Sequence, residues 1–273
     1  MSGESRSVCH AAGRQPPVSG GRVSRVTDLF FPGGLSLSTV GEASMRVETT
    51  IDVVDQKRWY RVGGLAALVL GICYVAIIPL YAHVGVPPNG GGEAWFKYLS
   101  GKTTFWWTIL GLSVFTDFLF VPVALALYLA LKGVNRNAML LATAFVGLFV
   151  VLDLAITWSH YASILTLYRE YSKAADDANR AGYVAAANYA SAILSCPLEI
   201  VYAIVTLSSG ILVTGFVMLR GPFSKITAYL GLATGLLGIA SLTGLSLIII
   251  GNALFATAWL FSVGHRLYRL AQE

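Results

Sequence analysis

Hydrophobic and polar positions divide this chain into a polar first part and a series of long apolar runs. The runs cover residues 62–82, 104–131, 138–161, 197–219, 226–243 and 246–264. An α-helix needs about 20 predominantly apolar residues to cross the hydrocarbon layer of a bilayer. The pattern therefore predicts an all-α, polytopic integral membrane protein with a six-helix transmembrane bundle within residues 57–270.

The last two runs belong to one apolar stretch, residues 226–264, which is too long for one crossing. We divide it near Thr243 and Gly244. Its segment "GLATG", residues 231–235, is followed one turn later by Gly238. Small residues on one face let membrane helices approach closely. We expect this face to pack within the bundle, with dimerisation as the alternative.

Residues 1–56 are rich in Gly, Ser and Arg, and they lack both helical periodicity and the apolar centre of a signal peptide. Two interpretations are open. This part is either a disordered N-terminal tail, or a mis-annotated extension in which residues 1–44 precede a natural start at Met45.

Composition agrees with a membrane protein, because 56% of the 273 residues are hydrophobic and only 12% are charged. Soluble domains carry about 25% charged residues. The net charge of +5 does not require a nucleic-acid partner, since membrane proteins collect Lys and Arg in cytoplasmic loops. We expect the lipid bilayer as the main partner and no nucleic acid.

The loops between the runs differ in their content of Lys and Arg. Nine lie on the side of the chain termini: Lys57, Arg58, Arg61, Lys132, Arg136, Arg220, Lys225, Arg266 and Arg269. Five lie on the opposite side: Lys97, Lys102, Arg169, Lys173 and Arg180. Because cytoplasmic loops carry the excess, we expect a protein of the cell (cytoplasmic) membrane with both termini in the cytoplasm.

A few polar side chains interrupt the apolar runs at the middle or in the outer half of the expected membrane. An Asp at the centre of a membrane helix costs about 2.5–3.5 kcal/mol, so each one calls for a reason. The candidate ligand- or proton-binding residues are Asp117, Asp153, His160, Glu199, Tyr202 and Asn252. None of the six runs contains a Lys or Arg that would neutralise the acids.

Acids that share a cavity do not all ionise without a cation, because desolvation and mutual repulsion disfavour their charged forms. Such a site holds protons, a cation, or a cationic or hydroxyl-bearing small molecule. We interpret Asp117 as the central carboxylate and Asp153 and Glu199 as its neighbours. Tyr202 and Asn252 then orient the ligand in a pocket that opens toward the outer face.

Each candidate also has a structural interpretation. Glu199 follows Pro197 in a first helical turn, where the helix dipole stabilises an acid. Asp153 as a neutral acid and Asn252 are both suited to hydrogen bonds between helices. His160 is suited to the outer interface.

Several chemistries are set aside. The runs contain no Lys that would hold a retinal Schiff base, no phosphate-binding loop, and no pair of His at metal-binding spacing on one helix. The three cysteines, Cys9, Cys73 and Cys196, suggest neither disulfides nor a metal knuckle. We therefore expect no cofactor and no metal, with a site of His83, His160 and a carboxylate as the weaker alternative.

Two segments resemble a known family. They are "DFLFVPVALALYLALKGVNRNAMLLATAF" (117–145) and "SSGILVTGFVMLRGPFSKITAYLGLATGLLG" (208–238). They resemble a bacterial and archaeal family of multi-pass membrane proteins known only as a domain of unknown function, over roughly residues 58–266. A Phe-Ser-Lys loop stands here where that family has Phe-Pro-Arg. The resemblance implies multi-pass architecture and no particular reaction.

Three functions remain open. The first is a binding or translocation protein for a proton, a small cation or a small amphipathic molecule. The second is an intramembrane lipid hydrolase or isoprenoid cyclase that uses the acids as proton donors, with Trp106, Trp107, Phe115 and Phe120 lining its pocket. The third is a structural or accessory subunit whose acids make helix–helix hydrogen bonds.

Overall fold

The computed structural model describes residues 37–273, and these residues contain helices and connecting segments without a β-strand. Contacts divide the chain into two units, residues 1–48 and 49–273, and the second unit contains the apolar helices. The prediction of a disordered or mis-annotated tail over residues 1–56 falls mostly on residues 1–36, which lie outside the described residues.

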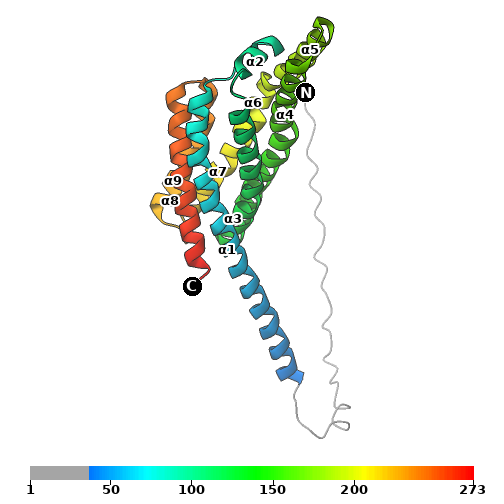
Figure 1. Ribbon diagram of the computed structural model, residues 1–273. Coiled ribbons are helices and arrows are strands. Elements are labelled where there is room, and N and C mark those ends of the chain that lie inside the picture. Colours follow the sequence, from blue (N-terminus) through cyan, green and yellow to red (C-terminus); the bar gives the residue numbers. More distant parts are fainter. Residues whose placement is uncertain (1–36) are drawn as a thin grey trace, which may run out of the picture. The chain divides into compact units, whose positions relative to one another are not determined.

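The helices follow one another closely along the chain (Figure 1). The α-helices are α1 Leu37–Val84, α2 Gly92–Leu99, α3 Thr103–Leu152, α4 Ser159–Lys173, α5 Asp177–Leu194, α6 Pro197–Ile200, α7 Thr206–Met218, α8 Lys225–Ala240 and α9 Ser246–Leu270. Two π-helices, η1 Asp153–Trp158 and η2 Val201–Val205, and one 3-10 helix, η3 Ser241–Thr243, complete the described secondary structure.

Five helical segments of the described residues are long and apolar enough to cross a membrane. They are Asp55–Val84, Thr103–Lys173, Pro197–Met218, Lys225–Thr243 and Ser246–Leu270. The prediction of an all-α membrane protein is confirmed at this level. The second and third predicted runs both fall in the segment Thr103–Lys173, which is 71 residues long.

The segment Thr103–Lys173 is a helical hairpin. Asn135 interrupts helix α3 with φ −154° and ψ 95°, and its side-chain oxygen accepts a hydrogen bond from the backbone N–H of Ala138 at 3.0 Å. This is the capping bond that an Asn makes where a helix begins. Residues at matching distances from this break meet across the hairpin, such as Phe120 and Phe149, whose rings lie 5.8 Å apart. The two arms therefore run antiparallel.

Helix α1 packs between the first arm of α3 and helix α9 (Figure 1). A methyl group placed on Gly63 would overlap the Cβ of Ala126 in α3. A methyl group placed on Gly64 would lie 3.1 Å from the carbonyl oxygen of Gly264 in α9. These glycines let the helix backbones come close, as small residues do in membrane bundles.

The remaining neighbours close the bundle. The second arm of α3 packs on α7, α7 packs on α8, and α8 packs on α9. A methyl group on Gly235 of α8 would lie only 2.7 Å from the Cβ of Leu212 in α7, and one on Gly231 would lie 2.8 Å from Nε1 of Trp259 in α9. The prediction that the "GLATG" face packs within the bundle is confirmed.

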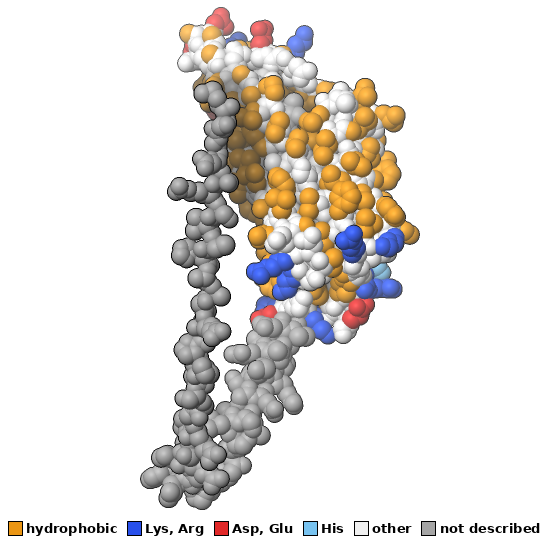
Figure 2. Space-filling model, turned by 180° about the vertical axis from the view of Figure 1, so that it is seen from behind, with side chains coloured by type: hydrophobic (Ala, Val, Ile, Leu, Met, Phe, Trp, Pro, Cys, Tyr) orange, Lys and Arg blue, Asp and Glu red, His pale blue; other side chains and the backbone are white. Residues whose placement is uncertain are grey.

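The outward surface of the helices is apolar. Figure 2 shows hydrophobic side chains over the sides of the helices and Lys and Arg side chains toward the ends. Large apolar side chains on several helices are exposed, among them Leu65, Leu140, Phe216, Leu236 and Leu247. Exposed apolar surface of this extent is expected where lipid replaces water as the solvent.

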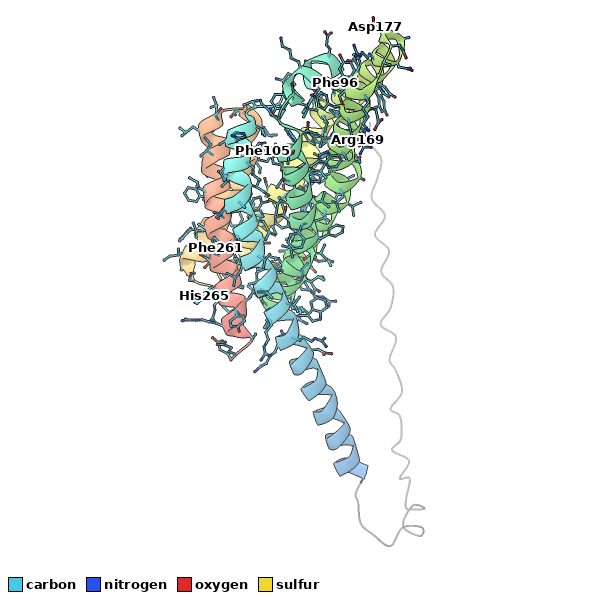
Figure 3. All side chains as sticks on the ribbon, in the orientation of Figure 1. Phe96, Phe105, Arg169, Asp177, Phe261 and His265 are labelled. Atoms are coloured by element: carbon cyan, nitrogen blue, oxygen red, sulfur yellow. The ribbon has the colours of Figure 1, made fainter. Side chains whose placement is uncertain are left out.

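Helices α2, α4 and α5 pack together at one end of the bundle. Figure 3 shows Phe96 of α2 and Asp177 of α5 at that end and His265 of α9 at the opposite end. Ser191 of α5 joins α5 to the α2 region, because its hydroxyl donates to the carbonyl of Gly90 at 2.6 Å and accepts from Nε1 of Trp95 at 3.1 Å.

Asp176 caps the first turn of α5. Its carboxylate accepts a hydrogen bond from the backbone N–H of Asn179 at 2.7 Å. This bond favours the ionised form and holds the pKa of Asp176 below its usual value, with a smaller contribution from the Asn179 side chain.

The close contact of α7 and α8 yields a stability prediction. Gly235→Ala adds a methyl group 2.9 Å from the backbone nitrogen of Leu212, so the helices must separate, and we expect the free energy of unfolding to fall by about 1–3 kcal/mol. Gly147→Ala is the matched control, because its methyl group meets no atom within 4 Å. Thermal unfolding in detergent checks both, and equal melting temperatures would contradict the packing.

Candidate functional site

Two buried carboxylates meet between the arms of the α3 hairpin. Nε1 of Trp158 lies 2.9 Å from Oδ2 of Asp117 and 2.9 Å from Oδ2 of Asp153, so one N–H is shared by two acceptors. The two oxygens are therefore separated by no more than twice that distance. Asp117 is 3% exposed and Asp153 is 6% exposed. We call Asp117 and Asp153 the acid pair and Trp158 its indole donor.

The π-helix η1 explains why the donor lies in this position. Asp153 is its first residue and Trp158 its last, five positions later. A π-helix makes its hydrogen bonds between residues i and i+5, so side chains five apart lie on the same face. In an α-helix the neighbours on one face are three and four positions apart. The wider turn therefore brings the Trp158 indole onto the carboxylate of its own helix.

Glu199 extends the polar site toward helix α6. The hydroxyl of Thr157 donates to Oε1 of Glu199 at 2.9 Å. Thr157 is buried and directly precedes Trp158, the donor of the acid pair. Glu199 lies in the short helix α6, immediately before the second π-helix η2. Both π-helices thus adjoin residues of the acidic site, which is where such turns are frequently found.

An aromatic cluster continues from the indole donor toward the end that carries α2. The ring of Trp158 lies 5.6 Å from that of Tyr161, which stacks on Trp106 at 5.2 Å. Trp106 in turn contacts Trp95 at 6.0 Å in an edge-to-face arrangement. Trp95 and Trp106 are almost fully buried. The acid pair is therefore covered by packed aromatic rings on this side.

No ion pair of the described residues includes either Asp117, Asp153 or Glu199. Their hydrogen-bond donors are the neutral groups of Trp158 and Thr157. The ion pairs that the described residues do form lie at exposed positions, such as Arg169 with Glu170. The site can therefore hold a proton or accept a cation without first breaking a salt bridge.

The structure places three other predicted residues outside the acid pair. Tyr202 lies one turn beyond Glu199, and its carbonyl accepts the hydroxyl of Thr206. Asn252 lies close to Gly238 of α8, and its buried side-chain oxygen has no hydrogen-bond partner in the described part of the chain. Neither side chain is hydrogen-bonded to an acid.

His160 is not hydrogen-bonded to the acid pair either. Its Nδ1 lies 2.6 Å from the carbonyl of Ile156, and its ring lies 6.3 Å from the ring of Tyr189 in α5. The sequence spacing predicts Asp153, Thr157 and His160 on one helix face. The π-helical turn alters that register, so Trp158 rather than His160 meets Asp153.

Trp158 is absent from the site residues predicted from the sequence. Its position beside His160 predicts an interfacial aromatic, because a Trp near the end of an apolar run is typical of the membrane interface. The signal that would have identified it is its five-residue spacing from Asp153, which has meaning only once a π-helix is known.

Among the residues whose side chains the structure describes, 55–199 and 201–273, no group of three or more His, Cys, Asp or Glu side chains is arranged to hold a metal ion. His83, named in the weaker alternative with His160, packs on the ring of Phe105 at 4.3 Å. The donors present at the acid pair are two carboxylates and one indole N–H, which does not ligate metals.

Comparison with known proteins supplies no relative from which a function could be transferred. No family model matches the chain, and searches of curated proteins and of solved structures found no match. The resemblance of residues 117–145 and 208–238 to a multi-pass family stays a prediction, and any functional inference depends on the site itself.

The shared indole N–H leads to a prediction. Trp158→Phe keeps an aromatic ring and removes the donor that both carboxylates share, so we expect a loss of about 1–3 kcal/mol in the free energy of unfolding. Trp107→Phe is the control, because Trp107 is 42% exposed and its change should stay within about 0.5 kcal/mol. Chemical unfolding in detergent measures both, and a Trp158→Phe protein as stable as the control would refute the shared bond.

Proposed function

We propose that this chain is a six-span protein of the cytoplasmic membrane that binds and exchanges a proton at the Asp117–Asp153 pair, with a small cation as the alternative occupant. The break at Asn135 supports a sixth crossing, because each arm of the α3 hairpin is long enough to span the bilayer. The distribution of Lys and Arg supports cytoplasmic termini.

One observation carries the proposal: two buried carboxylates accept the same N–H and form no ion pair with a described Lys or Arg. Two negative charges this close repel strongly in a medium of low dielectric constant. A proton shared between the carboxyl groups removes that repulsion and supplies a second hydrogen bond. Intramembrane acids arranged in this way are typical of proton pathways.

Glu199 and Thr157 supply a route between the pair and the outer end of the bundle. Glu199 is half-buried and lies in the first turn of α6, the helix that follows α5. The hydroxyl of Thr157 donates to Glu199, and Thr157 directly precedes Trp158, the donor of the acid pair, so Thr157 is our candidate for the group that passes a proton between Glu199 and the pair. A hydroxyl can donate and accept at the same time, which suits it to this role.

The geometry favours a proton over a small amphipathic molecule. Neither the cavity beside Phe120 and Trp259 nor the cavity beside Asn135 is lined by the acids. The aromatic rings above Trp158 are in contact with one another at stacking distances. A proton needs only the hydrogen-bonded side chains, whereas an organic ligand needs open volume beside them.

No specific observation favours the intramembrane enzyme. Of the four aromatics suggested for its pocket, Trp107 and Phe115 are exposed on the outward surface. Phe120 packs against Phe149 in the bundle core, and Trp106 belongs to the aromatic cluster. The structural-subunit hypothesis differs from the proposal in its prediction for the acids, and a measurement of proton flux separates the two.

The test is proton flux into liposomes that contain the purified chain and a pH-sensitive dye. We expect Asp117→Asn and Asp153→Asn to reduce the flux to that of protein-free liposomes, since an amide cannot exchange the shared proton. Asp177→Asn removes an exposed acid outside the site and should leave the flux unchanged.

A second readout uses the indole donor itself. Trp158 contacts both carboxylates, so its fluorescence should change with pH as the pair gains or loses its proton. The transition should disappear in Asp117→Asn. If both Asn variants keep the flux and the fluorescence transition and lose only thermal stability, the structural interpretation holds and the proposal is wrong.

A further inference from the structure

A second site lies at the turn of the α3 hairpin, at the end of the bundle away from α2. A cavity of about 380 Å3 is found there between α3 and the last turns of α7. This volume lies within the range of about 300–1,000 Å3 that small-molecule sites occupy. It shares no lining residue with the acid pair.

The walls of this cavity are apolar. Val134 and Ala138 line it from the two sides of the Asn135 break, and Val213 and Phe216 line it from α7. Phe216 is 58% exposed and Val134 is 38% exposed. Both belong to the outward surface that faces lipid in a membrane, so the cavity is accessible from the bilayer.

One end of the cavity is positively charged. Arg220 lines it directly, is exposed, and makes no side-chain hydrogen bond or ion pair with any described residue. Lys132 and Arg136 lie within three residues of Asn135 along the chain and are exposed as well. The same end thus joins an apolar slot, an unpaired guanidinium and two further cations.

We propose that this cavity binds an anionic phospholipid from the leaflet on the side of the α3 turn. One acyl chain lies against Val213 and Phe216, and the phosphate is bound by the guanidinium of Arg220. Arg binds phosphate through paired N–H donors. Basic pockets between transmembrane helices are suited to anionic head groups.

Charge and polarity select this occupant. A soluble anion such as inorganic phosphate gains nothing from the apolar walls, and a zwitterionic lipid leaves the excess positive charge unbalanced. A second copy of the chain fits less well. Its own Lys132, Arg136 and Arg220 would come close to the same residues of the first copy, and the like charges would repel. The proposal is independent of the proton site, since its residues lie elsewhere on the hairpin.

Native mass spectrometry of the full detergent-purified chain tests the site. Phosphatidylglycerol and phosphatidylcholine with identical acyl chains are added at increasing concentration. We expect the wild type to retain one phosphatidylglycerol preferentially. Arg220→Gln should weaken this binding by about fivefold and leave phosphatidylcholine binding unchanged.

Two further variants control for general charge and for the cavity itself. Arg269→Gln removes an exposed positive charge at the same end, outside the cavity, and should change the affinity less than twofold, in contrast to the roughly fivefold effect of a contacting charge. Ala138→Leu fills the slot without changing the charge and should also release the lipid.

Three results would overturn the proposal. Equal losses of phosphatidylglycerol affinity in Arg220→Gln and Arg269→Gln would mean that the lipid is attracted by the positive charge of this end of the bundle as a whole. Unchanged lipid retention in Ala138→Leu would place the lipid outside the cavity. Displacement of phosphatidylglycerol by inorganic phosphate would identify a site for free anions. Because Arg220 is exposed and unpaired, its replacement leaves the fold intact.

Discussion

The indole N–H of Trp158 is the hydrogen-bond donor on which the centre of this bundle depends. In a bilayer no water is present to satisfy a buried polar group, so Asp117 and Asp153 require a donor from the protein. That requirement accounts for two local features. The hairpin at Asn135 brings the two acids side by side, and the π-helix η1 turns Trp158 onto both.

The positions of the helices could be read from the sequence because they depend on local composition. The run 197–219 corresponds to the segment Pro197–Met218, and the division near Thr243 falls at the 3-10 helix Ser241–Thr243. The acids could be selected for the same reason, since a carboxylate within an apolar run is conspicuous whatever its neighbours are. Their adjacency in space follows from the antiparallel hairpin, which the short polar segment "KGVNRN" already suggests.

The orientation of side chains around each helix could not be read in this way. A run that is apolar on all faces carries little periodicity, so nothing in the residues 138–161 reveals where the helix widens to a π-turn. The wider π-turn rotates the later residues about the helix axis. His160 therefore does not share a face with Asp153, and its ring lies near Tyr189 of helix α5 instead. The surroundings of Asn252 could not be read from the sequence for another reason. Asn252 lies in α9, and its neighbours depend on how closely α8 approaches, which the glycines of α8 determine.

Stability alone does not account for the acid pair. Each Asp within a membrane helix costs about 2.5–3.5 kcal/mol near the bilayer centre. A hydrogen bond to a charged group contributes about 1.5–3 kcal/mol, and here a single N–H serves two carboxylates. The bond from Trp158 alone therefore does not offset the insertion of two acids. Asn at either position would accept the same N–H and would insert at lower cost. What Asn lacks is a proton that leaves and returns, and that difference is our reason for proposing proton exchange at this pair.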